Sequence, residues 1–136
     1  MKSATDAYKA YLAMSEEITA DGGSNPERIE SFVTPELLQG NLDGFEDLRD
    51  QGVLTVGNSA IDSVRLQQID SSSLSVSVYL CVDLKGLRLV NSEGVDVTPP
   101  DRPDRVPLVA TFARDQSQQD HLLLSGNDPW SGDNYC

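Results

Sequence analysis

The sequence predicts an α+β fold, in which a long N-terminal helix and short helices pack on an antiparallel sheet of four to five strands. Two observations carry this prediction. Apolar residues recur every three or four positions up to residue 52, and they alternate with polar residues from there to residue 126. A chain of 136 residues suits one domain. We therefore expect a single domain over 1–136, with a helical part (1–52), a sheet (53–126) and a C-terminal tail (127–136).

The helices are predicted from an apolar stripe and from capping signals. The stripe runs over 4–18 at helical spacing, and the glycines at 22–23 end it because glycine readily adopts the left-handed C-cap conformation. Asn25-Pro26 starts a second helix, with a capping side chain before a proline. Thr34-Pro35-Glu36 repeats that signal, and Gly52 closes the last helical stretch. We therefore expect one long helix followed by short, broken ones.

The strands are predicted from two-residue alternation. In the stretch 74–84 every even-numbered residue is apolar, so this face is expected to lie against the helices and Cys81 to lie on the opposite face. The stretch 60–67 precedes it, and the serine-rich turn 69–73 joins the two as antiparallel neighbours. Further strands are expected at 87–89 with an extension over 95–97, at 106–112 and at 121–125.

The charge of the chain excludes two classes of partner. Ten Lys and Arg against 22 Asp and Glu leave a formal charge of −12. A polyanion of this size repels phosphate backbones and anionic lipid headgroups, so we expect no nucleic-acid partner and no adsorption to membranes. No stretch approaches the roughly 20 apolar residues that a transmembrane helix needs, so no transmembrane segment is predicted.

The two cysteines, Cys81 and Cys136, allow two interpretations: a disulfide, or two unrelated thiols. We favour the disulfide, because a terminal cysteine would hold down a tail that otherwise frays, and because closing such a loop stabilises a fold by about 4 kcal/mol. The tail would then cross the outer face of the sheet, where Trp130 gains a surface to cover. A disulfide indicates an oxidising compartment. No apolar export signal is present, so the protein is either cytoplasmic or freed of a leader, and we favour the second.

Short segments along most of the chain carry a resemblance to a known fold family. They are 8–13, Pro26-Glu27 with 34–38, Tyr79-Leu80-Cys81-Val82-Asp83, Val106-Pro107-Leu108, and 126–130 with Cys136. Together with the order of elements they resemble the NTF2-like (cystatin-related) cone, and more narrowly small secreted or lipid-anchored actinobacterial proteins of unknown function. The resemblance implies a strongly curved sheet and an exported domain in which Cys81 and Cys136 are bridged. It implies no catalytic residues and no cofactor.

Candidate catalytic groups are few. The sequence has no glycine-rich phosphate loop and no nucleophile elbow, and with one histidine, His121, a structural zinc site within one chain is excluded. Asp62 is in phase with Ala60 and Val64, so it would point at the helices, where burial would raise its pKa and suit it to act as a general base. The alternative, which we favour, is that Asp62 lies in solvent at the start of its strand. No metal or cofactor is expected.

Two functions remain. The first is a non-catalytic extracytoplasmic domain that binds or scaffolds at the cell envelope, with an unknown protein or a small apolar ligand as its partner. The second is a small isomerase or hydrolase that acts on an apolar molecule, with Asp62 as general base. The first predicts a cone filled by aromatic side chains, namely Tyr8, Tyr11, Phe32 and Phe45; the second requires a hollow of a few hundred Å³ with convergent polar groups. We favour the first, and a monomer over a dimer, because the tail would cover the open sheet face.

Overall fold

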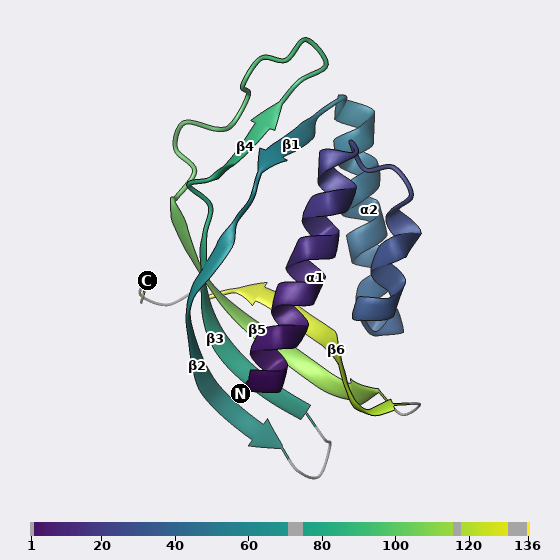
Figure 1. The fold of residues 1–136 in the computed structure, drawn as a ribbon, viewed down its shortest axis with the longest axis vertical. Coiled ribbons are helices and arrows are strands. Elements are labelled where there is room, and N and C mark those ends of the chain that lie inside the picture. Colours follow the sequence, from purple (N-terminus) through teal and green to yellow (C-terminus); the bar gives the residue numbers. More distant parts are fainter. Residues whose placement is uncertain (1, 71–74, 116–117, 131–135) are drawn as a thin grey trace.

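The computed structural model describes residues 2–70, 75–115, 118–130 and 136. Its helices lie on one side of a curved sheet (Figure 1). The helices are α1 (Lys2–Ala20), the 3₁₀-helix η1 (Pro26–Phe32) and α2 (Pro35–Gln51). The strands are β1 (Leu54–Gly57), β2 (Ala60–Asp70), β3 (Ser75–Asp83), β4 (Leu87–Val90), β5 (Arg105–Asp115) and β6 (Gln118–Pro129). The predicted α+β fold is confirmed, with α1 as the long N-terminal helix.

The sheet is antiparallel and divided in two. Four strands form the main sheet in the order β2-β3-β5-β6, and β1 pairs with β4 in a separate two-stranded sheet. The strand β1 was not predicted, because four residues are too short to establish an alternation. The expected extension over 95–97 is an isolated bridge between Val90 and Asp96, and the serines at 71–73 lie outside the described residues.

The second half of the helical part differs from the prediction. The stretch 35–51 is one continuous helix rather than two short ones, since Gly40 and Gly44 lie inside α2. Glycine in a helix interior costs about 1 kcal/mol relative to alanine, which the packing of apolar side chains from α2 on the core offsets. Neither Asn25 nor Thr34 makes the expected side-chain cap. Asn25 adopts a left-handed conformation with φ of 50°, and Arg28 Nε donates to its carbonyl oxygen at 2.9 Å.

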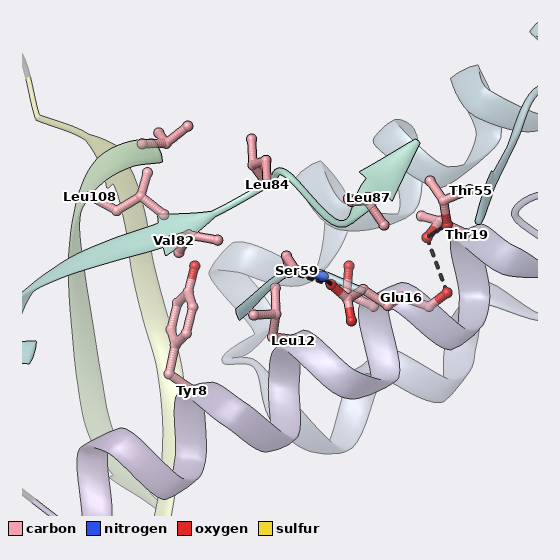
Figure 2. A pocket seen from close by; sticks show the side chains of 12 residues that line it. Tyr8, Leu12, Glu16, Thr19, Thr55, Ser59, Val82, Leu84, Leu87 and Leu108 are labelled. Atoms are coloured by element: carbon pink, nitrogen blue, oxygen red, sulfur yellow. Dashed lines mark hydrogen bonds between the residues drawn. The ribbon is translucent and has the colours of Figure 1, made fainter. Parts of the chain in front are cut away.

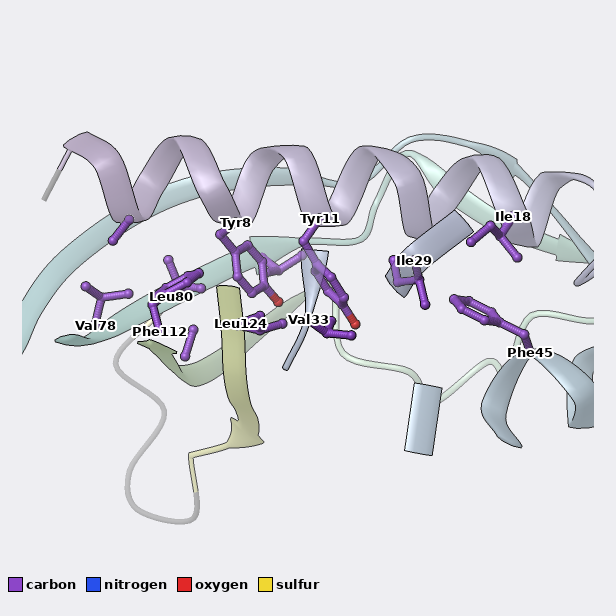
Figure 3. Close-up of a cluster of buried hydrophobic side chains, with 13 residues drawn as sticks. Tyr8, Tyr11, Ile18, Ile29, Val33, Phe45, Val78, Leu80, Phe112 and Leu124 are labelled. Carbon is purple, nitrogen blue, oxygen red and sulfur yellow. The ribbon is translucent and has the colours of Figure 1, made fainter. Parts of the chain in front are cut away.

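The core lies between α1 and the main sheet. The predicted inner face of β3 is confirmed, because Val78, Leu80 and Val82 are buried. In Figure 3 side chains of α1 point at those of the sheet, and the ring of Tyr8 meets that of Phe112 edge-on at 6.4 Å between centroids. The buried cluster comprises Ala4, Tyr8, Tyr11, Ile18, Ile29, Val33, Phe45, Val78, Leu80, Val82, Ala110, Phe112 and Leu124.

Of the four aromatic side chains expected to fill the cone, three lie in this cluster and Phe32 packs against it. The interior is therefore packed around these rings. A hollow remains farther along α1, where the helix passes β1.

Candidate functional site

A pocket of about 270 Å³ lies between α1, the start of the two-stranded sheet and the adjoining ends of β3 and β5 (Figure 2). Half of its lining is aliphatic, and the other half carries hydroxyl groups or a carboxylate. The aliphatic side is formed by Leu12, Val82, Leu84, Leu87, Val106 and Leu108, and the polar side by Tyr8, Ser15, Glu16, Thr19, Thr55 and Ser59. The pocket thus combines an apolar surface with polar groups placed to orient a ligand.

Helix α1 supplies the floor of the pocket through one row of side chains. Tyr8, Leu12 and Glu16 follow one another at four-residue spacing, so they lie above one another on a single helix face. The same face packs against the sheet through Tyr8, which is buried. The row therefore continues from the core into the pocket, and it ends in a carboxylate.

The carboxylate of Glu16 binds the connection between β1 and β2. Its Oε1 accepts the backbone N–H of Ser59 at 2.7 Å and also accepts the hydroxyl of Ser59. The chain reaches this position through Gly57, whose φ of 85° and close approach to the carbonyl oxygen of Gly86 admit no side chain. Glycine at 57 is thus a condition for the placement of Ser59 beside the helix.

A second polar link closes the far end of the pocket. The hydroxyls of Thr19 on α1 and Thr55 on β1 lie 2.7 Å apart and form a hydrogen bond. At the core end, the hydroxyl of Tyr8 donates to Asn127 Oδ1 at 3.2 Å. Burial raises the pKa of Tyr8, so its phenol stays protonated at physiological pH. The polar groups of the pocket are hydroxyls apart from the carboxylate of Glu16.

Of the two placements considered for Asp62, the register of β2 excludes the one in which it points at the helices. Ile61 pairs with Val82 and Ser63 with Cys81, so the strand bulges by one residue at Asp62. Ile61 and Val64 pack against the core in its place. Asp62 is turned to the outer face, where its carboxylate accepts two hydrogen bonds from the guanidinium of Arg105.

The outer face also holds both cysteines. The Sγ atoms of Cys81 and Cys136 lie 2.13 Å apart, a disulfide-bonding distance, with 5.7 Å between the Cα atoms. Arg105 donates to the backbone carbonyl of Cys136, and Trp130 packs edge-on against Tyr79 at 5.3 Å between ring centroids. Tyr79, Cys81, Arg105, Trp130 and Cys136 are called here the outer clasp, and the interior pocket lies on the other side of the sheet.

The side chain of His121 lies outside the described residues. Within the part of the chain that the structure describes, no three His, Cys, Asp or Glu side chains gather as a metal ion would require, and no helix is both long and apolar enough to cross a bilayer.

Glu16 and Ser59 were missed by sequence reasoning. Glu16 carries one usable signal, since it extends the row of Tyr8 and Leu12 along the helix face that the apolar stripe predicts to be inward. Ser59 carries none, because it lies 43 residues away in a loop and only the tertiary structure brings it to the helix.

No protein-family model matches this sequence, and no curated protein matches it. Solved structures do match by shape. The intermembrane space region of the chloroplast protein ARC6 is 7% identical over 96% of both chains, with a TM-score of 0.66. A protein from Catenulispora acidiphila in complex with S-DNPA is 11% identical over 95% of both chains, with a TM-score of 0.58.

A third similar structure is Aln2 from a Streptomyces species. It is 14% identical, covers 93% of this chain and 87% of its own, and has a TM-score of 0.54. At such identities the likeness extends to the fold and not to activity. The shape shared with these structures supports the cone-like α+β fold of this chain.

Proposed function

We propose that this protein is a non-catalytic, extracytoplasmic binding domain that holds a small, largely apolar ligand in the pocket beside α1. One observation carries the proposal: the pocket of about 270 Å³ is lined on one side by six aliphatic side chains. Since a cavity of about 150 Å³ holds benzene, this one has room for about eleven non-hydrogen atoms. Burial of the apolar body supplies the binding energy, and the hydroxyl-bearing side orients the ligand.

A binding role has better support than catalysis by Asp62. A general base must reach the proton that it removes, and Asp62 lies on the outer face, bound to Arg105. The pocket itself contains one carboxylate, Glu16, of which one oxygen is engaged by Ser59. The proposed role of the pocket is therefore to bind the ligand and not to convert it.

The cysteine pair supports the proposed location. Disulfides persist in oxidising compartments and are rare in the cytosol, so a bond between Cys81 and Cys136 fits a protein of the cell envelope or the medium. The test is alkylation of free thiols in protein taken directly from its host, followed by mass measurement. Alkylation of both cysteines without prior reduction would contradict an extracytoplasmic location and favour the cytoplasm.

The outer clasp supports a monomer. It covers part of the sheet face through which a second copy would pack, because Trp130 lies on Tyr79 there. Light scattering should report a mass close to the 14.8 kDa of one chain. A species of twice that mass would contradict the monomer without affecting the pocket.

Binding is tested with 4-phenylbutan-1-ol, a neutral probe of about eleven non-hydrogen atoms that matches the space. Titration should shift the NMR signals of residues around the pocket, with a Kd of about 1 mM or below. Leu12→Trp fills the pocket from α1 and should abolish binding. Leu48→Trp is the control, because Leu48 lines a separate hollow between α1 and α2. NMR shifts confined to the hollow lined by Leu48, or equal binding of the probe by both variants, would refute the proposal.

A further inference from the structure

We propose that the ligand of this pocket carries a protonated amine next to its apolar body, and that Glu16 is the residue that selects it. This inference rests on the proposed function and names its ligand class. It follows from the residues that line the pocket, from the hydrogen bonds that the Glu16 carboxylate makes and from the net charge of the whole chain.

The lining contains one charged side chain among the described residues. Eleven of the twelve residues that line the pocket are aliphatic or bear a neutral hydroxyl, and Glu16 is the twelfth. Figure 2 shows its carboxylate at the pocket wall between Leu12 and Thr19, beside Ser59. A ligand that fills the apolar side therefore places its polar end near the carboxylate of Glu16. No Lys or Arg of the described residues lines the pocket.

The carboxylate retains the capacity to bind a further donor. Oε1 accepts both hydrogen bonds from Ser59, whereas no donor of the described residues binds Oε2. Glu16 forms no ion pair with a described Lys or Arg, although its neighbour Glu17 pairs with Arg28 at 3.4 Å. A half-buried carboxylate is stabilised most by a charged donor, and hydrogen bonds between charged partners are about twice as strong as neutral ones.

Glu16 lies where two hollows meet. A second hollow of about 350 Å³ shares Leu12, Glu16 and Ser59 with the apolar pocket. Lys9 also lines this second hollow, together with Glu16, whereas no Lys or Arg of the described residues lines the apolar pocket. Among the described residues, a cationic ligand in the apolar pocket therefore meets the carboxylate of Glu16 with no Lys or Arg in the lining.

The charge of the protein acts in the same direction. A net charge of −12 raises the local concentration of cations and lowers that of anions. An apolar acid would meet both this field and the carboxylate of Glu16, whereas an apolar amine is attracted by both. An arylalkylamine with a short chain satisfies the volume and the charge together.

The test compares three probes of one shape: 4-phenylbutylamine, 4-phenylbutan-1-ol and 4-phenylbutanoate, titrated into the intact protein at constant ionic strength. We expect the amine to bind about tenfold or more tightly than the alcohol, and the acid to bind least. Glu16→Gln should remove the advantage of the amine over the alcohol, so that the two bind with similar affinity. Glu17→Gln is the matched control, since it removes the same charge one residue away and should keep the preference.

Ser59→Ala gives a second arm that does not depend on the folding of the Glu16 variant. It removes the hydroxyl that competes for Oε1, so the amine should bind at least as tightly as in the parent protein. Equal affinities of amine and alcohol, or an amine preference that survives Glu16→Gln, would overturn the inference alone. Failure of all three probes to bind would overturn the proposed function together with it.

Discussion

Arg105 holds both carboxylate oxygens of Asp62 through one edge of its guanidinium: Nε donates to Oδ2 at 2.7 Å and Nη2 donates to Oδ1 at 2.9 Å. The two residues are 43 positions apart and belong to β5 and β2, which are not neighbours in the sheet. The pair spans β3 on the outer face, and the same guanidinium also donates to the carbonyl of Cys136. The carboxylate that the sequence suggested as a base is thus linked to the C-terminal residue through Arg105.

This pairing makes part of the stability dependent on pH. The hydrogen bonds from Arg105 lower the pKa of Asp62 below its ordinary value of 3.8. A depressed folded-state pKa means that the stabilisation is present above pH 3.8 and is lost as the pH falls through the lowered value. We therefore expect Asp62→Asn to be less stable than the parent at about pH 6, with a difference that shrinks steadily below the ordinary pKa of the carboxyl.

The measurement is urea unfolding at a series of pH values. Asp101→Asn, at an exposed position, is the control and should show no such trend. A difference between Asp62→Asn and the parent that stays constant from neutral pH to the acid limit would show that the ion pair does not stabilise the fold.

Loss of the cysteine link should lower stability strongly. Cys81 and Cys136 are separated by 55 residues, and the chain-entropy model gives about 4 kcal/mol for a loop of this length. Cys136→Ser should therefore lower the free energy of unfolding by about that amount in urea. Reductant should lower the stability of the parent to the same level and leave the variant unchanged. An effect of reductant on Cys136→Ser would point to another cause.

The tail itself can be followed by fluorescence, because Trp130 is the sole tryptophan of the chain. In the parent its ring packs on Tyr79 and its backbone N–H donates to the carbonyl of Pro107 at 3.0 Å. Opening of the outer clasp in Cys136→Ser should shift its emission to longer wavelength under native conditions. An unchanged spectrum would show that β6 holds Trp130 in place without the cysteine link.

The core prediction concerns the inner face of β3. Leu80 is completely buried, and truncation of a buried leucine leaves a cavity that costs about 2–5 kcal/mol. Leu80→Ala should fall in this range in urea unfolding at neutral pH. Leu54→Ala is the matched control, since Leu54 on β1 is 36% exposed and should cost clearly less. Equal losses at the two positions would contradict the assigned inner face.

Gly57 should resist substitution more than another glycine of positive φ. A side chain at Gly57 would collide with the carbonyl oxygen of Gly86, whereas one at Gly94 would meet open space. In both variants the alanine must adopt a left-handed backbone conformation, which costs about 1 kcal/mol. Gly57→Ala must in addition displace the backbone at Gly86. We expect Gly57→Ala to be the less stable of the two and to displace the backbone N–H of Ser59 from Glu16. An unshifted Ser59 amide signal in Gly57→Ala would contradict this.

The local sequence pattern predicted much of the secondary structure and its buried faces. The apolar spacing of α1 and the alternation of β3 are properties of consecutive residues, so the buried faces at Tyr8 and Leu80 could be inferred from them. The pattern failed at Gly40 and Gly44, because the cost of a helical glycine is small compared with the packing of its apolar neighbours.

The candidate site depended on the tertiary structure. A bulge between Ile61 and Ser63 reverses the side on which Asp62 lies, and alternation in the sequence cannot locate an inserted residue. The pocket needs Glu16 and Ser59 in contact across 43 residues, a contact that no short-range periodicity encodes. The sequence by itself determined which faces are apolar, whereas only the folded chain decided which carboxylate meets the cavity, because that depends on the register and on the close approach of distant segments.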